Sequence, residues 1–362
     1  MLSSEEILRA PKVLLHDHVD GGLRAASMIE MANESGYRAL PFSSEGELAD
    51  WYEASCSSGS LVRYLETFTH TIALMQTKEQ IIRVAREAVI DIADSGVVYA
   101  EIRGAPELFT EKGLSIREVV EAHLEGYAQG VSEARLRGKN IRVGTILCGM
   151  RQNNLTREVA ELTIALRKNG VVGFDIAGPE AGYPPTNHLS AFTYLHENGF
   201  PFTIHAGEAD GVESISKAIH ECKASRIGHG VRLIDDIDLR DGLENATLSP
   251  LAKEIRDRQI ALELAPTSNV QTGAALNYES HPIGVMKKLG FAVTLNTDNR
   301  LMSRTSMVRE ATEIAHAHNW SLQDLEDVAT NAISAAFIPP EEREEILSTQ
   351  IRAGYREIEN GH

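Results

Sequence analysis

Short apolar or β-branched runs alternate along the chain with longer segments in which apolar residues recur at helical spacing. The short runs predict eight strands: Val13–Val19, Val97–Arg103, Ile141–Leu147, Val171–Ile176, Phe202–His205, Arg226–His229, Ile260–Leu264 and Phe291–Asn296. The longer segments predict amphipathic helices that include Glu79–Ser95, Ile116–Arg137, Arg157–Asn169, Leu251–Arg258, Ser321–Phe337 and Glu341–Ile358. This repeated alternation of strand and helix predicts an α/β fold of the (β/α)8 TIM barrel type.

The first two predicted strands are separated by about eighty residues, which is more than one crossover helix needs, so we expect a helical insertion after strand 1. Apolar residues in this insertion follow helical spacing at Leu61, Tyr64, Leu65, Phe68 and Ile72. Periodicity alone favours core packing for this stripe, and its place after strand 1 leaves a lid as the alternative. Pro339-Pro340 separates two extra C-terminal helices. With no internal repeat or linker, a single domain of residues 1–362 is predicted.

Composition and charge limit the classes of function. Hydrophobic residues make up 43% and charged residues 24% of the 362, which is typical of a soluble globular protein. The net charge of −17 argues against nucleic acid or an anionic membrane as a partner. Residues 1–12 contain no apolar leader, and no segment has the length of a membrane span, so we expect a cytoplasmic protein. The three scattered cysteines are expected to be free thiols.

The first predicted strand ends in two histidines, His16 and His18, followed by Asp20. Side chains two residues apart on a strand point to the same face, so both imidazoles can reach one metal ion. An isolated His-x-His is more often structural than functional. Polar residues at the ends of the other predicted strands favour a functional role for this pair instead.

Polar motifs also follow the later strands. They are Gly173-Phe-Asp-Ile-Ala-Gly-Pro-Glu180, Thr203-Ile-His-Ala-Gly-Glu208, Arg226-Ile-Gly-His-Gly230, Pro266-Thr-Ser-Asn269 and Leu295-Asn-Thr-Asp-Asn-Arg300. The C-terminal ends of barrel strands meet at one rim, where the active sites of such barrels are built. Several histidines and an aspartate on one rim are the ligands that a metal bound by nitrogen and oxygen requires.

On these motifs the chain resembles the adenosine deaminases of the metal-dependent amidohydrolase superfamily over nearly its full length. The motifs His-x-His-x-Asp-Gly, His-Ala-Gly-Glu, Gly-His-Gly, Pro-Thr-Ser-Asn and Asn-Thr-Asp occur in the order of that family. The Leu61–Phe68 helix and the Ile146–Arg151 stretch resemble family segments that border the nucleoside pocket.

The resemblance implies one Zn²⁺ per chain, with a purine nucleoside and water as the substrates. It implies no particular oligomeric state. It places the metal ligands at His16, His18, His205 and Asp298. Zinc would lower the pKa of water to about 7 and supply hydroxide. His229 is implied to hydrogen-bond that water without being a ligand.

Glu208 is implied to be the general acid. The equivalent family carboxyl protonates purine N1, which makes C6 electrophilic so that hydroxide can attack and ammonia can leave. This role requires a pKa raised by burial and by neighbouring negative charge. The alternative for Glu208 is a solvated loop carboxylate.

The resemblance also implies four substrate-binding residues: His18, Asp20, Gly178 and Asn299. In the family, the N–H of Gly178 meets purine N3, and Asp20 accepts from the ribose 5′-hydroxyl. A 5′-phosphate beside Asp20 would meet like charge, so AMP is not an expected substrate.

Asn299 departs from the family pattern, in which a second aspartate follows the metal ligand and meets purine N7. Because N7 only accepts, an aspartate must be protonated to donate to it, whereas an asparagine amide donates at every pH. We therefore predict that Asn299 keeps the N7 contact and can alter the choice among purine nucleosides.

Three rival functions are weighed against adenosine deamination. A sister enzyme would act on adenine or on a 5′-modified adenosine such as aminodeoxyfutalosine. A two-metal amidohydrolase would bridge its metals with a lysine at the end of strand 4, and this chain has none there. A noncatalytic nucleoside-binding or signalling protein would need neither Glu208 nor an activated water.

Overall fold

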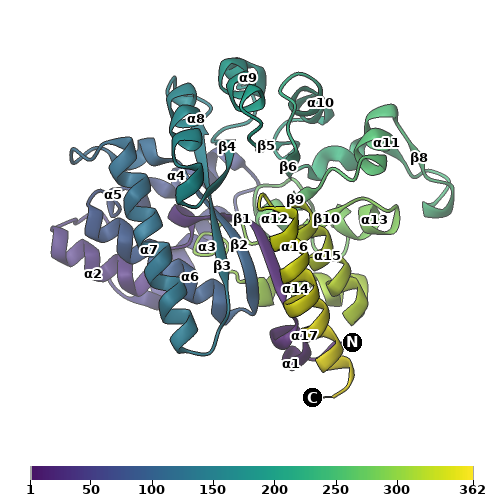
Figure 1. The fold of residues 1–362 in the computed structure, drawn as a ribbon, viewed down its shortest axis with the longest axis horizontal. Helices are drawn as coiled ribbons and strands as arrows, with labels where there is room; N and C mark the ends of the chain where they lie inside the picture. The colour runs from purple at the N-terminus through teal and green to yellow at the C-terminus, as the bar shows by residue number, and fades with distance from the viewer. Residues whose placement is uncertain (1, 362) are drawn as a thin grey trace.

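The computed structural model describes residues 2–361, and its centre is a barrel of eight parallel strands (Figure 1). The barrel strands are β1 (Lys12–His18), β2 (Val97–Gly104), β3 (Arg142–Met150), β4 (Val171–Ala177), β5 (Thr203–Ala206), β6 (Arg226–His229), β9 (Leu262–Leu264) and β10 (Val293–Leu295). All eight overlap the strands predicted from the sequence, and the last two, β9 and β10, are shorter than predicted.

Hydrogen bonds join the strands in the orders β1-β2-β3-β4 and β10-β9-β6-β5. Parallel bridges between Asp17 and Asp298 and between Phe174 and Phe202 connect these two halves. The barrel is therefore closed, which confirms the predicted (β/α)8 fold. A short antiparallel hairpin of β7 (Ile237–Asp238) and β8 (Thr247–Leu248) was not predicted and lies outside the barrel.

Helices surround the barrel (Figure 1). Before β3 they are α1 (Ser4–Arg9), α2 (Ala25–Ser35), α3 (Glu45–Cys56), α4 (Leu61–Glu66), α5 (Phe68–Ala73), α6 (Lys78–Asp94) and α7 (Ile116–Leu136). After β3 they are α8 (Thr156–Ala165), α9 (Leu189–Glu197), α10 (Val212–His220), α11 (Pro250–Asp257), α12 (Pro266–Gln271), α13 (Pro282–Lys288), α14 (Met307–His318), α15 (Leu322–Ala335), α16 (Pro340–Ile346) and α17 (Arg352–Glu359). The helices predicted from periodicity are all present, with small differences at their ends. A π-helical segment, Leu347–Ile351, joins α16 to α17.

The predicted helical insertion after β1 is present, and five helices, α2 to α6, lie between β1 and β2. The apolar stripe predicts one helix. In the structure it is divided between two helices, α4 and α5, because the helix is interrupted at Thr67. The hydroxyl of Thr67 donates to the carbonyl oxygen of Tyr64 at 2.7 Å and so competes with the helical backbone. Helix α6 begins at a capping box formed by Thr77 and Gln80, which satisfies backbone N–H groups at its start.

The first and last helices of the chain pack against each other. Helix α1 contacts α14 and α17, and the N- and C-terminal ends lie near each other (Figure 1). Cys56, Cys148 and Cys222 are buried free thiols, as predicted. Within residues 2–361, no helix has the length and apolar character that crossing a bilayer requires.

Candidate active site

Four predicted ligand residues meet at the C-terminal rim of the barrel. His16 and His18 come from β1, His205 from β5, and Asp298 from the segment after β10. One donor atom of each lies within 4.8 Å of the donor atoms of the others. The Nε2 atoms of His18 and His205 are 3.2 Å apart, and Asp298 Oδ1 lies 3.3 Å from His16 Nε2. The four side chains can therefore share one ion.

The chemistry of this donor set fits zinc. Zinc is bound in proteins by imidazole nitrogens and carboxylate oxygens, and a catalytic site leaves one further position for a reactant. Burial lowers the pKa of His18 and of His205, which keeps their lone pairs free for a metal. Although burial opposes ionisation, the adjacent imidazole of His16 holds the pKa of Asp298 well below its usual range. His16 Nε2 is buried without a hydrogen-bond partner, as expected of an atom placed for a metal.

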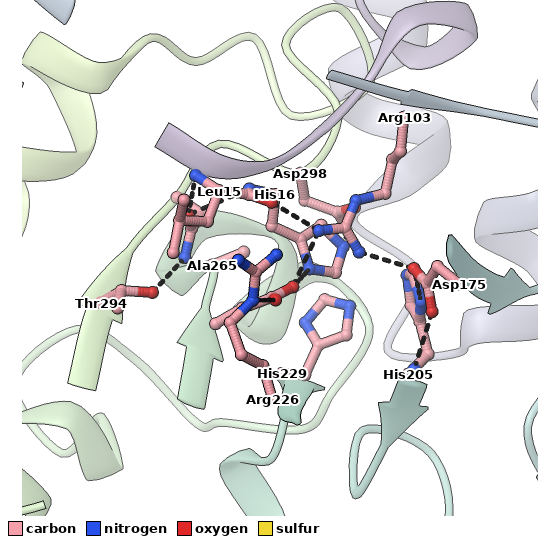
Figure 2. Close-up of polar contacts among 12 residues, drawn as sticks. Leu15, His16, Arg103, Asp175, His205, Arg226, His229, Ala265, Thr294 and Asp298 are labelled. Atoms are coloured by element: carbon pink, nitrogen blue, oxygen red, sulfur yellow. Dashed lines mark hydrogen bonds and ion pairs between the residues drawn. The ribbon is translucent and has the colours of Figure 1, made fainter. Parts of the chain in front are cut away.

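Buried carboxylates orient two of these histidines (Figure 2). His16 Nδ1 lies 2.9 Å from Glu263 Oε2 on β9, and His205 Nδ1 lies 2.8 Å from Asp175 Oδ2 on β4. A carboxylate at Nδ1 holds the ring proton there and directs the lone pair of Nε2 toward the metal position. The hydroxyl of Ser268 donates to Asp298 Oδ2 at 2.6 Å and fixes the carboxylate ligand as well.

Two arginines inside the barrel hold the orienting carboxylates (Figure 2). Arg103 donates to Asp175 at 2.6 Å and to Glu263 at 2.8 Å, and Arg226 donates to Glu263 at 2.7 Å. Arg103 is fully buried, as are both of its carboxylate partners. Sequence reasoning missed this layer. The available signal was a charged residue inside an apolar strand, as in Leu262-Glu-Leu264.

Glu208 and His229, which the family resemblance implies as the catalytic pair, lie beside the ligand cluster. Glu208 Oε2 is 3.6 Å from His229 Nε2, and both side chains are buried. Burial, and then the negative charges of Asp298 and Glu180, raise the pKa of Glu208 well above its usual range. A raised pKa favours the protonated form of Glu208, which is the form that an acid needs.

Backbone strain marks two residues of this site. His229 and Asp298 have φ angles of 60° and 56°, in the left-handed region that residues other than glycine rarely occupy. Such a conformation costs on the order of 1–3 kcal/mol and persists where the surrounding structure enforces it. The backbone conformation that places these two side chains at the rim therefore lowers the stability of the fold.

Glu180 fixes the turn that carries Glu208. Its carboxylate accepts hydrogen bonds from the backbone N–H groups of residues 207–210 at 2.6 to 3.0 Å. It also accepts from the hydroxyl of Ser214 at 2.6 Å. Sequence reasoning quoted Glu180 as the end of a motif but gave it no role. Its five hydrogen bonds make it the anchor of the His-Ala-Gly-Glu turn.

A cavity of about 360 Å³ opens above this cluster. The predicted residues His18, Asp20, Gly178, His205, Glu208, His229, Asp298 and Asn299 all line it. Its wall contains all five stripe residues of α4 and α5, together with Leu108 and Met150. The stripe therefore covers the site, as in the lid alternative, while Tyr64 and Phe68 also pack in the core.

Two of the predicted substrate-binding residues have buried polar atoms without a hydrogen-bond partner. Asp20 is buried with an unpartnered Oδ1, and burial raises its pKa to about 7. Asn299 is buried with an unpartnered Oδ1. A Cβ on Gly21 would lie 1.9 Å from that oxygen, so glycine in the first motif makes room for Asn299. Gly178 has a φ of 100°, which brings its backbone to the cavity surface.

Comparison with known proteins identifies the family. The adenosine deaminase family model matches residues 11–353. Adenosine deaminase 1 of Streptomyces coelicolor is 52% identical over 359 residues, which cover 99% of this chain and 90% of that protein. The adenosine deaminase of Mycobacteroides abscessus is 49% identical over 350 residues, 96% of each chain. The crystal structure of an amidohydrolase from Burkhoderia ambifaria with bound zinc shares the fold, with a TM-score of 0.81 at 21% identity and coverage of 100% of this chain and 95% of that one. The chain belongs to the adenosine deaminase family.

Proposed function

We propose that the protein catalyses the hydrolytic deamination of adenosine and 2′-deoxyadenosine to inosine, 2′-deoxyinosine and ammonia, as a zinc-dependent enzyme of purine salvage. The observation that carries this proposal is the position of Glu208 and His229 on the cavity side of the four-residue ligand cluster. Glu208 as the acid, His229 as a second proton-bearing group and the metal position would then all face C6 of the purine. Deamination by water requires this combination.

His16, His18, His205 and Asp298 would hold one zinc ion per chain. When bound, zinc supplies a hydroxide nucleophile at neutral pH by lowering the pKa of water. Glu263, Asp175 and Ser268 keep the ligand side chains in place as the reaction proceeds.

The chain's own residues would manage the proton transfers. Protonated Glu208 would donate its proton to purine N1, which withdraws electrons from C6 and favours addition of water there. His229 Nε2 would stabilise the oxygen that becomes bonded to C6. Proton transfer to the amino group then lets ammonia leave, so that one water is consumed for each ammonia released.

The cavity favours a neutral nucleoside. Asp20 would accept from the ribose 5′-hydroxyl, Gly178 would present its N–H to N3, and the Asn299 amide would donate to N7. Within residues 2–361, neither lysine nor arginine lines the cavity, so a 5′-phosphate would find no cation to pair with. AMP is therefore not an expected substrate, whereas Asp20 favours a substrate that carries ribose over free adenine.

We further propose that residues 1–362 form one catalytic domain and that the protein is cytoplasmic, without a nucleic-acid or membrane partner. The supports are the continuous barrel with its terminal helices and the net charge of −17. Cell fractionation with an antibody against the chain would test the location.

The test of function is a substrate panel. Purified protein is given adenosine, 2′-deoxyadenosine, adenine, AMP and a 5′-modified adenosine, and ammonia is measured before and after treatment with a chelator. We expect release from the first two compounds only, lost with the chelator and restored by zinc. Preferred release from adenine or from the 5′-modified compound would replace the proposal with the corresponding sister deaminase. Tight nucleoside binding with no release from any compound would indicate a noncatalytic binding protein.

A further inference from the structure

His229 lies as close to the ligand cluster as the ligands lie to one another. Its ring centroid is 4.7 Å from that of His16 (Figure 2). The centroids of His16 and His18 are 5.3 Å apart. Ring position alone therefore does not separate His229 from the ligands, although His229 is outside the four-residue group whose donor atoms lie within 4.8 Å of one another. The explanation lies in the hydrogen bonds at its other ring nitrogen, Nδ1.

Asn269 in α12 contacts that nitrogen. Asn269 Nδ2 is 3.0 Å from His229 Nδ1, while Asn269 Oδ1 is 3.3 Å from the backbone nitrogen of Ala265. A backbone N–H can only donate, so the oxygen of the amide must face Ala265 and the NH₂ group must face His229. His229 Nδ1 is therefore the acceptor.

His281 fixes the same amide from the opposite side. The N–H of Ile283 donates to His281 Nδ1 at 3.1 Å, so the proton of neutral His281 is on Nε2, which lies 3.3 Å from Asn269 Oδ1. Burial lowers the pKa of His281 to about 3, which keeps the ring neutral. His281 and Asn269 are both fully buried, so water does not compete for these hydrogen bonds. The backbone N–H groups of Ala265 and Ile283 thus fix which atoms donate and which accept in the hydrogen bonds that join His281, Asn269 and His229.

We propose that Asn269, held by Ala265 and His281, is a positioning residue that keeps the proton of neutral His229 on Nε2. An Nε2–H group has no lone pair for a metal and donates a hydrogen bond into the cavity instead. His16 and His205 are held in the opposite tautomer, because carboxylates face their Nδ1 atoms. Tautomer choice, set by different neighbours, therefore separates the metal ligands from the proton donor in one cluster of imidazoles. The catalytic consequence rests on the proposed function, whereas the tautomer itself does not.

The direct test is nuclear magnetic resonance of the full chain labelled with ¹⁵N-histidine, in which His229→Gln assigns the signals of His229. We expect the Nδ1 shift of an unprotonated ring nitrogen and the Nε2 shift of a protonated one. A protonated Nδ1 in the unaltered protein would overturn the proposal. If the tautomer is as expected and adenosine is not deaminated, the proposed function fails and this inference stands.

Two variants test whether Asn269 sets the tautomer. In Asn269→Asp the carboxylate can only accept, so a proton should move onto His229 Nδ1. In Asn269→Leu, which removes both donor and acceptor, the shifts of both ring nitrogens should move toward the average of the two tautomers. Unchanged His229 shifts in both variants would contradict the proposal.

Kinetics of adenosine deamination separate positioning from general damage. A catalytic histidine in the wrong tautomer should lower kcat by roughly 10²–10⁴-fold with little change in KM. The matched control is Thr267→Val in the same helix, which removes a hydrogen bond to Tyr278 and leaves the Asn269 contacts in place. The control should keep both the His229 shifts and kcat. An equal loss of kcat in Thr267→Val and Asn269→Asp would assign the effect to α12 as a whole and overturn the positioning role.

Discussion

Different forces hold the two parts of the cavity. We call the metal-ligand cluster its floor and the apolar stripe of α4 and α5 its wall. On the floor, His16, His205 and Asp298 come from strand ends, and each contacts a buried carboxylate or hydroxyl. The wall is formed by α4 and α5, whose contacts are mainly apolar, and Val62 on it is 61% exposed. The floor is fixed by directional hydrogen bonds and charge, whereas the wall is fixed by burial, which has no direction.

This difference separates chemistry from binding. A metal site and a proton donor lose function when they move by fractions of an ångström, so a rigid barrel with buried ion pairs suits them. An apolar wall tolerates adjustment and contributes to affinity through the area it covers. Changes to the floor should therefore affect metal content and kcat, while changes to the wall should affect KM.

The largest effect is expected from removing a metal ligand. Asp298→Ala should abolish zinc binding and lower kcat by on the order of 10⁴-fold or more, because the nucleophile is no longer generated at neutral pH. Metal analysis and ammonia release measure both quantities. Full zinc content in this variant would contradict the assignment of Asp298. Asp50→Ala, on the exposed surface, is the control.

Glu208→Gln should lower kcat by roughly 10²–10⁴-fold and leave zinc content unchanged, because an amide keeps the shape and cannot release a proton. Only protonated Glu208 is active, so in the unaltered enzyme the rate should fall as pH rises through the raised pKa of this carboxyl. That decline should be missing from the residual activity of Glu208→Gln. A variant with the same decline would show that another group causes it.

Arg103→Met tests the layer below the floor. It leaves Asp175 and Glu263 less well compensated, so we expect a loss of about 3–5 kcal/mol in the free energy of unfolding and weaker zinc binding. Arg24→Met breaks an ion pair with Asp91 whose arginine is 39% exposed, and should cost about 0–1 kcal/mol. Denaturant titration compares the two. Equal losses would mean that burial of the pair does not matter.

Asn299→Asp tests the predicted hydrogen-bond donor to purine N7. Losing a hydrogen bond to N7 should raise KM by roughly 10-fold at high pH, and less at low pH, where the new carboxyl is protonated and can donate. KM measured across pH for both proteins checks this. Full activity without added pH dependence would remove the basis for the predicted donor role of Asn299.

The smallest effect is expected on the wall. Leu65→Ala removes part of the apolar cover and should raise KM by roughly 5-fold, about 1 kcal/mol of lost burial, with kcat unchanged. Leu136→Ala, 89% exposed on α7, is the matched control and should change neither constant. A fall in kcat with constant KM would place Leu65 in the chemistry.

Residues that repeat a local pattern could be predicted from the sequence. Short apolar runs predict the strands, and the shared rim of a barrel predicts a group of polar residues at their ends, from which the family resemblance selects His16, His18, His205 and Asp298 as ligands. The break at Thr67 was missed because a side-chain hydrogen bond, invisible to periodicity, interrupts the helix. Arg103, Glu263 and the Asn269–His281 pair were missed because their roles depend on contacts between distant strands or on which ring nitrogen carries a proton.

Zinc titration of the chelator-treated protein tests most directly whether one metal ion, held by the ligand cluster, drives the reaction. Ammonia release from adenosine should rise from near zero and reach a plateau at one zinc per chain. A plateau at two zinc ions per chain, or full activity in the chelator-treated protein, would contradict it.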